Sequence, residues 1–347
     1  MKRIQTVLGD ISPEKLGTTM MHEHLFWNQN VYQREVEPGS EEAKFFYSKI
    51  TTENMYKIRQ YNLHNHKENA YQDNVDEAIE EVLLLKQAGG NTLVDCSCLG
   101  ISRNPQGEVE VSKKTGVNVI MSTGIYVDGS CTEATSLSLS EKAELFIKEL
   151  TEGVDNTGIK AGVIGEIGIN DGFSKCNQES LAAAAIAQKE TGAAILIHQP
   201  GIWKIGHYFL DILEDNGACM EKVVLCHCDP ICDDIRYLER LLARGVNLSF
   251  DQFGLEAQLS DGNGRGFWLP RDIDRVRAIA RLCELGYSKQ LVLSQDLCFK
   301  TCYVKYGGGG YAHVINDILP IMRGENIYET AIRNMLVSNP ARILAMP

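Results

Sequence analysis

His22 and His24 stand two residues apart in the segment of residues 18–25, and this spacing suits metal binding. Alternate side chains of a β-strand share one face, and each residue rises roughly 3.3 Å, so both imidazoles can reach one ion. The pair alone is a moderate signal, because an exposed His-Glu-His has the same spacing without binding a metal. Further candidate ligands elsewhere in the chain must decide between a metal-binding pair and an exposed pair that binds no metal.

Eight short runs rich in Val, Ile and Leu predict a parallel sheet, because most of them are separated by segments with helical apolar spacing. The expected strands are residues 18–25, 92–97, 118–123, 162–167, 194–198, 223–227, 247–251 and 291–296. The expected helices are residues 75–88, 108–115, 141–152, 179–191, 205–216, 234–244 and 273–285. Eight such β/α units predict an α/β fold of the (β/α)8 TIM barrel type.

Six metal-capable side chains fall at the C-terminal ends of these strands, namely His22, His24, Glu166, His198, His227 and Asp296. In a closed parallel barrel these ends converge on one rim. Four histidines and two carboxylates exceed what one tetrahedral ion needs. We therefore expect two divalent ions: the first is bound by His22, His24 and Asp296, the second by His198 and His227, and Glu166 bridges both.

Two ions roughly 3.5–4 Å apart hold a hydroxide between them, which is a strong nucleophile at neutral pH. This arrangement predicts a hydrolase. Asp296 is the expected catalytic residue, taking the proton of the hydroxide and helping to pass it to the leaving group. Any single residue has a structural alternative: His198 or His227 as a buried core histidine, Asp296 as a helix N-cap.

Two other ligand sets are disfavoured. Cys226, Cys228 and Cys232 surround His227, but on a strand Cys226 and Cys228 face away from it, which argues against a structural zinc site. Lys160 shares a face with Glu166 but lies six residues earlier, roughly 20 Å toward the opposite rim, so it cannot serve as the bridging ligand.

Length and composition predict one globular barrel domain, residues 1–347, with 44% hydrophobic and 23% charged residues. The net charge of −12 disfavours nucleic-acid and anionic-membrane partners, which leaves a small-molecule substrate. The chain lacks a secretory signal and any run of about 18 apolar residues, so we expect a cytoplasmic protein. Its 11 cysteines are expected to be free thiols.

Two long connections break the β/α rhythm. Residues 26–74 form a polar and aromatic insertion directly after the two histidines, so we expect it to wall or cover the active-site mouth. Residues 252–271 contain Gly262, Gly264 and Gly266 and are expected to form a mobile or simply solvated loop.

With these residues in place, the chain resembles the phosphotriesterase family of the amidohydrolase superfamily over nearly its whole length. The matching pieces are QTVLG (5–9), LGTT (16–19) leading into HEH (22–24), GVIGEIG (162–168), the lone histidines of strands five and six, Asp296, KYGGGGY (305–311) and NPARIL (339–344). The likeness is greatest to the phosphotriesterase-related branch, in which a glutamate replaces a carboxylated lysine. The resemblance implies a barrel, a binuclear zinc-type centre and hydrolysis of an ester, lactone, amide or phosphoester, with a homodimer as one candidate assembly.

The expected substrate contacts follow strand ends. Tyr126 lies just past strand three and Trp203 just past strand five, so both are pocket candidates. Lys300 is a third candidate, and Arg103, Arg271 and Lys305 are further cations that an anion could contact, or ordinary surface charges.

The chain departs from the family pattern at two positions. Gln295 occupies a position where a histidine is frequent in the family, and Pro230 occupies one where many relatives have an arginine. Both changes remove positive charge, so the resemblance implies a site less suited to a strongly anionic group. It also favours carboxylic esters, lactones and N-acyl amides as substrates. The alternatives are a phosphotriester or phosphoester hydrolase, a single-metal deaminase and a non-catalytic binding protein. The ligand types suit zinc, with manganese, cobalt and iron as alternatives.

Overall fold

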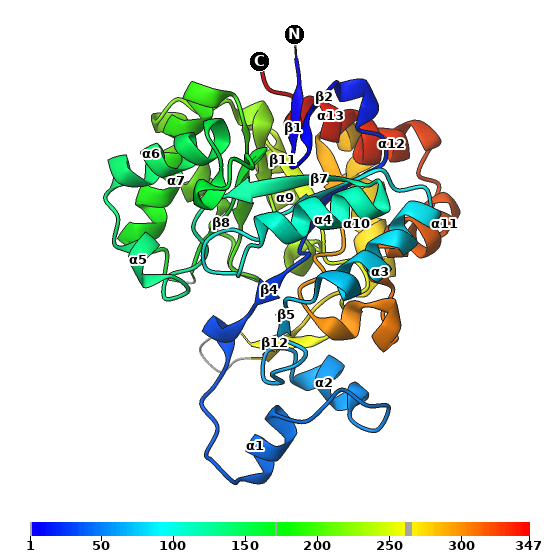
Figure 1. The fold of residues 1–347 in the computed structure, drawn as a ribbon. Helices are drawn as coiled ribbons and strands as arrows, with labels where there is room; N and C mark the ends of the chain where they lie inside the picture. Colours follow the sequence, from blue (N-terminus) through cyan, green and yellow to red (C-terminus); the bar gives the residue numbers. More distant parts are fainter. Residues whose placement is uncertain (1, 171, 261–265) are drawn as a thin grey trace.

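The computed structural model describes residues 2–170, 172–260 and 266–347, and its centre is a sheet of eight parallel strands (Figure 1). The strands are β3 (Thr19–Glu23), β6 (Thr92–Asp95), β7 (Asn118–Thr123), β8 (Val163–Gly168), β9 (Ala194–His198), β10 (Val223–Leu225), β11 (Asn247–Phe250) and β14 (Leu291–Leu293). Their order in the sheet follows the chain from β3 to β14. The predicted barrel of eight parallel strands is confirmed.

The seven expected helices surround the sheet. They are α3 (Val75–Gln87), α4 (Pro105–Thr115), α6 (Leu139–Thr151), α7 (Lys175–Thr191), α8 (Gly206–Asp215), α9 (Ile235–Leu242) and α10 (Asp272–Glu284). The sequence analysis identified no helix after the eighth strand, where α11 (Leu319–Gly324), α12 (Glu329–Arg333) and α13 (Asn339–Leu344) lie, nor the short α5 (Thr132–Thr135). The π-helical segments Val314–Ile318 and Asn334–Ser338 adjoin the later helices, so the 3.6-residue apolar period is interrupted there.

The barrel closes where its first strand meets the chain after its last. The backbone N–H of His22 donates to Ser294 Oγ at 2.9 Å, and the N–H of Asp296 donates to the carbonyl of His22 at 3.2 Å. Glu23, which is fully buried, adds a carboxylate to this seam. Its donors are Ser294 Oγ (2.6 Å), Gln295 N (2.8 Å), Gln295 Nε2 (3.0 Å) and Leu297 N (3.1 Å). The residue between the two histidines therefore fixes the segment that carries Asp296.

Five strands, β3, β6, β10, β11 and β14, end earlier than expected, and the ends of β10 and β14 bear most on the expected ligands. β10 stops at Leu225 and β14 at Leu293, so His227 and Asp296 lie in the turns that follow. Both have left-handed backbone conformations, with φ of 55° and 52°. Turning out of the extended conformation sets the direction of both side chains. A continuing strand would place His227 on the face of Leu225, opposite the face of Val224 and Cys226, so the turn matters most for His227.

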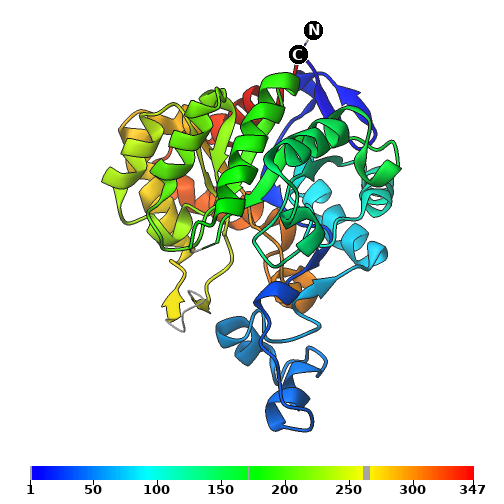
Figure 2. The same cartoon turned by 90° about the vertical axis from the view of Figure 1, so that its left-hand side faces the viewer.

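The insertion extends from the end of the barrel at which the strands terminate (Figures 1 and 2). Its base is an antiparallel pair, β4 (Trp27–Asn28) with β5 (Tyr71–Gln72), and its outer part contains α1 (Glu41–Phe46) and α2 (Met55–Tyr61). The second connection contains a hairpin, β12 (Gln258–Ser260) with β13 (Gly266–Trp268), where a loop was expected. Gly262 and Gly264 lie outside the described residues.

The two ends of the chain lie together at the opposite end of the barrel (Figure 1). An N-terminal hairpin, β1 (Ile4–Thr6) with β2 (Gly9–Ile11), precedes the barrel, and Arg3 and Met346 exchange backbone hydrogen bonds. The 11 cysteines are all unpaired. Within the part of the chain that the structure describes, none of the helices has both the length and the apolar character needed to cross a bilayer.

Glu23→Gln should lower the free energy of unfolding by about 2 kcal/mol or more, because in either orientation the new amide group faces backbone or side-chain donors. The measurement is urea unfolding of the metal-free protein. Glu144→Gln, at an exposed position of α6, is the control and should change stability by less than about 0.5 kcal/mol. A Glu23→Gln variant as stable as this control would show that the carboxylate does not secure the seam.

Candidate metal centre

The six expected ligands meet at the C-terminal end of the barrel, and four of them face one another as a first ion requires. His22 Nε2 lies 3.4 Å from Glu166 Oε2 and 3.7 Å from Asp296 Oδ1. His24 Nε2 lies 3.5 Å from Glu166 Oε1 and 3.2 Å from Asp296 Oδ1. A tetrahedral ion with bonds of about 2.0–2.2 Å separates its ligand atoms by roughly 3.3 Å, so these distances fit one.

A second group shares Glu166. His198 Nδ1 lies 2.9 Å from Glu166 Oε2 and 2.9 Å from His227 Nε2, and the last two atoms are 3.5 Å apart. Three sets of neighbouring side chains here can hold a metal ion: His22 with His24 and Glu166, His22 with His227 and Asp296, and Glu166 with His198 and His227. Because Glu166 offers an oxygen to each group, it stands where a bridging ligand must be.

His22 supplies a test of whether the site suits a metal. Its side chain is fully buried, yet neither ring nitrogen has a hydrogen-bond partner. An unsatisfied buried polar atom costs about 1–3 kcal/mol, so such atoms are rare in folded proteins. A cation between His22 Nε2 and the two carboxylates would satisfy that nitrogen, and the residues present therefore fit a metal ion.

The charges of the centre also suit a cation. Burial raises the pKa of Asp296, but hydrogen bonding with His24 and the charges of the histidines lower it to about 2. Burial lowers the pKa of His24, but Asp296 and Glu166 raise it to about 9. The pKa of Glu166 is likewise held well below its usual value by His198 and His22, against the effect of burial. Without an ion His24 carries a proton beside the carboxylates, and a divalent cation would replace it.

Local backbone features aim Glu166 at the centre. The register of β8 against β9 shifts between Ile164 and Ile167, and such a bulge redirects a side chain. Gly165 has φ of 124°, and a Cβ there would collide with the carbonyl of Leu196. The glycine flank therefore allows the close approach that the sequence suggested. Lys160 precedes β8 and is exposed.

Hydrogen bonds behind the ligands fix their ring orientation. Ser97 Oγ donates to the carbonyl of Phe26 at 2.7 Å and lies 3.0 Å from His24 Nδ1, so the imidazole donates to Ser97 and leaves Nε2 for the centre. His227 Nδ1 likewise lies 2.9 Å from Asp251 Oδ1, so its Nε2 faces His198 and Glu166 at the centre. The sequence analysis missed Asp251, although a carboxylate at the end of the seventh strand met the criterion that selected Asp296.

Asp251 is itself secured by a buried ion pair. Its backbone N–H donates to Asp229 Oδ2 at 3.0 Å, and Asp229 Oδ1 lies 2.9 Å from Arg275 Nε. Burial raises the pKa of Asp229 to about 7 although Arg275 opposes this shift. Both side chains have no exposed surface, so Arg275 compensates a charge that would otherwise be costly beneath the centre.

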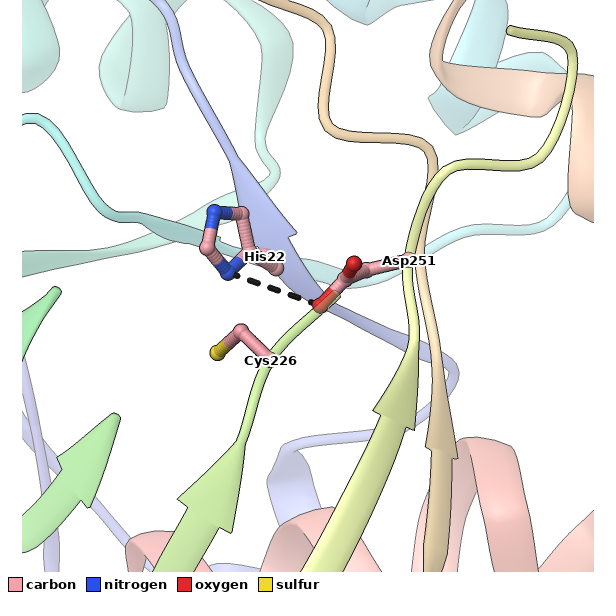
Figure 3. A group of neighbouring side chains, drawn as sticks. All are labelled: His22, Cys226 and Asp251. Carbon is pink, nitrogen blue, oxygen red and sulfur yellow. Dashed lines mark ion pairs between the residues drawn. The ribbon is translucent and has the colours of Figure 1, made fainter. Parts of the chain in front are cut away.

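A further candidate group lies on the other side of the His22 ring (Figure 3). It consists of His22, Cys226 and Asp251, with His22 Nδ1 3.7 Å from Asp251 Oδ2. Burial raises the pKa of the Cys226 thiol well above its usual value. Because a neutral thiol is a poor ligand, this group competes weakly with the centre. Among the described residues, no candidate group combines two of the cysteines around His227.

A cavity of about 850 Å³ opens beside the centre. Tyr126 and Trp203 line it, as expected. The insertion contributes Gln29, Val31, Tyr32, Arg34, His64 and Asn65 to its wall, and the β12–β13 hairpin contributes Leu259 and Phe267. Arg34 and His64 were not expected, because no local pattern marks which part of a long insertion folds back over the barrel.

The cations expected near substrate lie elsewhere. Lys300 pairs with Glu77 at 2.8 Å and does not line the cavity, so the structure gives no support to its place in the pocket. The other three are also paired: Lys305 with Glu77, Arg103 with Glu149 and Asp155, and Arg271 with Asp274.

The two departures from the family pattern differ in position. Gln295 donates to Glu23 and to the carbonyl of Tyr311, behind the centre, and does not line the cavity. Pro230 does line it.

Asp251→Asn should weaken metal binding by about 10- to 100-fold, because the amide no longer fixes the tautomer of His227 that presents Nε2. Metal content after dialysis against a graded series of chelator concentrations measures the effect, and thermal unfolding checks that the variant is folded. The control is Asp317→Asn, which changes one of the two carboxylate partners of His313, away from the centre. A folded Asp251→Asn protein with wild-type metal affinity would contradict the role given to Asp251.

Comparisons with known proteins agree with this geometry. The Phosphotriesterase family model matches residues 2–344. The N-acetyltaurine hydrolase of Homo sapiens is 33% identical, over 99% of this chain and 97% of its own. A resiniferatoxin-binding protein from Rhodobacter sphaeroides is 35% identical with a TM-score of 0.94, covering 99% of this chain and 94% of its own. A mutant lactonase from Deinococcus radiodurans is 28% identical with a TM-score of 0.76, covering 98% and 99%. The chain belongs to the phosphotriesterase family and is a hydrolase.

Proposed function

We propose that this protein uses two divalent ions to hydrolyse carbon-centred acyl bonds, in N-acyl amides, carboxylic esters or lactones. The observation that carries the proposal is the convergence of the ligand atoms of six side chains, with Glu166 common to both groups. Relatives named for an amide hydrolase and for a lactonase support the choice of bond. A small-molecule substrate suits the cavity, and a homodimer is the assembly we propose from the family resemblance.

In this proposal His22, His24 and Asp296 would hold the first ion, His198 and His227 would hold the second, and Glu166 would contribute to both. Two divalent ions, zinc foremost and manganese, cobalt or iron as alternatives, would activate a water molecule and polarise the carbonyl of the substrate. The surrounding hydrogen bonds keep the ligands rigid, so little reorganisation is needed when substrate binds.

Asp296 is the proposed catalytic residue. It lines the cavity, and Oδ1 faces His24, so Oδ2 is the atom we assign to taking a proton from the attacking water. The same carboxyl group then delivers that proton to the leaving nitrogen or oxygen.

Tyr126 is placed to bind the carbonyl oxygen of the substrate. Its hydroxyl accepts a hydrogen bond from Tyr32 at 2.9 Å, which leaves its own proton available to a ligand. Burial raises the pKa of this hydroxyl well above its usual value, so it remains a donor. Its ring centroid lies 5.0 Å from that of His198.

Ligand binding without catalysis is the second candidate, because the relative from Rhodobacter sphaeroides is named for the compound that it binds. A deaminase with a single ion is disfavoured, because it would leave the position of Glu166 between two groups unexplained. Phosphotriester hydrolysis uses the same ligands, so only substrates can separate it from acyl hydrolysis.

A substrate panel tests the proposed function. The zinc- or manganese-loaded protein is incubated with N-acetyl amino acids, aryl and alkyl esters, lactones and a phosphotriester, and turnover is followed by product release. We expect the highest kcat/KM within the acyl classes. Preference for the phosphotriester would overturn the choice of bond, and binding without turnover in any class would favour the second candidate.

Asp296→Asn should lower kcat by about 100-fold or more with the best substrate of that panel, since a positioned acid or base contributes about 10²–10⁴ in rate. Elemental analysis should still find about two ions per chain, because the remaining ligands and the amide oxygen persist. Turnover near the wild-type rate would remove the catalytic role of Asp296. One ion per fully active wild-type chain would overturn the binuclear assignment.

A further inference from the structure

Arg34 is the sole lysine or arginine among the described residues that line the cavity. Its guanidinium forms neither a hydrogen bond nor an ion pair within the described part of the chain, whereas its backbone N–H donates to Asn65 Oδ1 at 3.0 Å. The cations that the sequence singled out are, by contrast, all ion-paired. The backbone of Arg34 is thus held by a hydrogen bond, while its side chain places a positive charge without an ion-pair partner at the cavity.

The carboxylates of the cavity wall do not serve as its partner. Asp128 accepts from Ser174 Oγ at 2.5 Å and from Asn177 Nδ2 at 3.3 Å, so its two oxygens are already occupied. Glu166 and Asp296, the other acids of the lining, face the histidines of the centre. The described wall therefore contains an unused cation and no unused anion.

The segment that carries Arg34 is tied to the wall nearest the centre. Tyr32 donates to Tyr126 at 2.9 Å, and its ring centroid lies 4.8 Å from that of His64. His64 lines the cavity too, and burial lowers its pKa to about 4, so its ring is neutral at physiological pH. It therefore adds polar atoms without adding a second charge.

We propose that Arg34 binds an anionic group of the substrate, so that the preferred acyl compounds also carry a carboxylate or a sulfonate. This proposal replaces the expectation, drawn from Gln295 and Pro230, of a site less suited to a strongly anionic group, because Arg34 supplies a positive charge from the insertion. This inference rests on the proposed acyl hydrolysis. A guanidinium offers a planar fork of N–H donors that matches both oxyanions and stays charged at physiological pH. The chain has a net charge of −12, which disfavours the approach of anions in general. A positive charge at Arg34 would therefore favour those anionic substrates whose charged group reaches this position.

The rest of the lining defines the other end of the substrate. Apolar and aromatic side chains make up much of the wall, among them Val31, Ile169, Trp203, Leu255, Phe267 and Phe299. A cavity of about 850 Å³ with this lining has room for an apolar group as well as the scissile bond. The inferred substrate is therefore an amphiphile, with an anionic group at Arg34 and an apolar group against the aromatic wall.

The test compares charged substrates with neutral ones of similar shape. N-Acetyl-β-alanine is paired with N-acetyl-β-alaninamide, and N-acetyltaurine with its sulfonamide, and each pair is repeated with a hexanoyl group. For the wild type we expect a KM about tenfold lower for the anionic member of each pair, and a KM that rises with salt for that member alone. Arg34→Gln should abolish this difference by raising the KM of the anionic substrates, with kcat changed less than about twofold.

Two further variants separate charge from structure. Arg34→Lys should restore part of the preference because it keeps the charge but loses the fork of donors. Lys44→Gln, an exposed cation of α1 outside the cavity, should leave every KM unchanged. An equal loss for charged and neutral substrates in Arg34→Gln, or no charge preference in the wild type, would overturn the inference.

A binding measurement makes the inference independent of turnover. Calorimetry with the metal-loaded Asp296→Asn protein should give tighter binding for each anionic compound than for its neutral partner, and Arg34→Gln added to this background should remove the difference. If no compound is hydrolysed by the wild type but the binding difference is present, the proposed function fails and the role of Arg34 stands. If the wild type hydrolyses the acyl compounds without any binding difference, the proposed function stands and the role of Arg34 fails.

Discussion

The hydrogen bonds that Glu23 accepts from the chain after β14 are the interaction on which the centre depends. Glu23 stands between two ligands on the first strand and anchors the loop of the last. Closing the barrel and bringing Asp296 to the histidines are therefore one event, because the same carboxylate does both. A barrel left open at this seam would keep its hydrophobic layers but would separate the ligands contributed by its two ends.

Burying so much charge requires compensation beyond the centre. The ligands alone bring two carboxylates and four imidazoles out of water, and Asp251 and Asp229 add two more acids directly behind His227. Arg275, fully buried on α10, balances this second layer at 2.9 Å from Asp229. The centre itself lacks such a fixed counter-charge, and bound cations would supply it. The outer layer thus has a counter-charge from the protein itself, whereas His22 keeps unpartnered nitrogens beside the centre.

The strand order and the metal-capable set could be predicted because parallel strands are continuously apolar and the polar residues at their ends stand out. The turns at His227 and Asp296 could not be predicted, because their left-handed backbone conformations depend on contacts with Asp251 and with the barrel seam. Asp251 had the same signal as Asp296 and was missed. Arg34 had no such sequence signal. Its position at the cavity depends on how the insertion folds over the barrel, and long-range packing of that kind leaves no periodic pattern in the sequence.

The barrel and its insertion have separate roles, and this separation bears on the whole family. The ligands sit on strands and short turns held by buried hydrogen bonds, whereas much of the substrate wall comes from residues 29–65 and from the β12–β13 hairpin. Loops of this kind tolerate change because few core contacts depend on them. Relatives at 28–35% identity over nearly the full chain bear names that differ in the compound bound or hydrolysed. In this chain the position of Arg34 on that wall, and not the ligand set, would then decide which of the proposed acyl compounds is accepted.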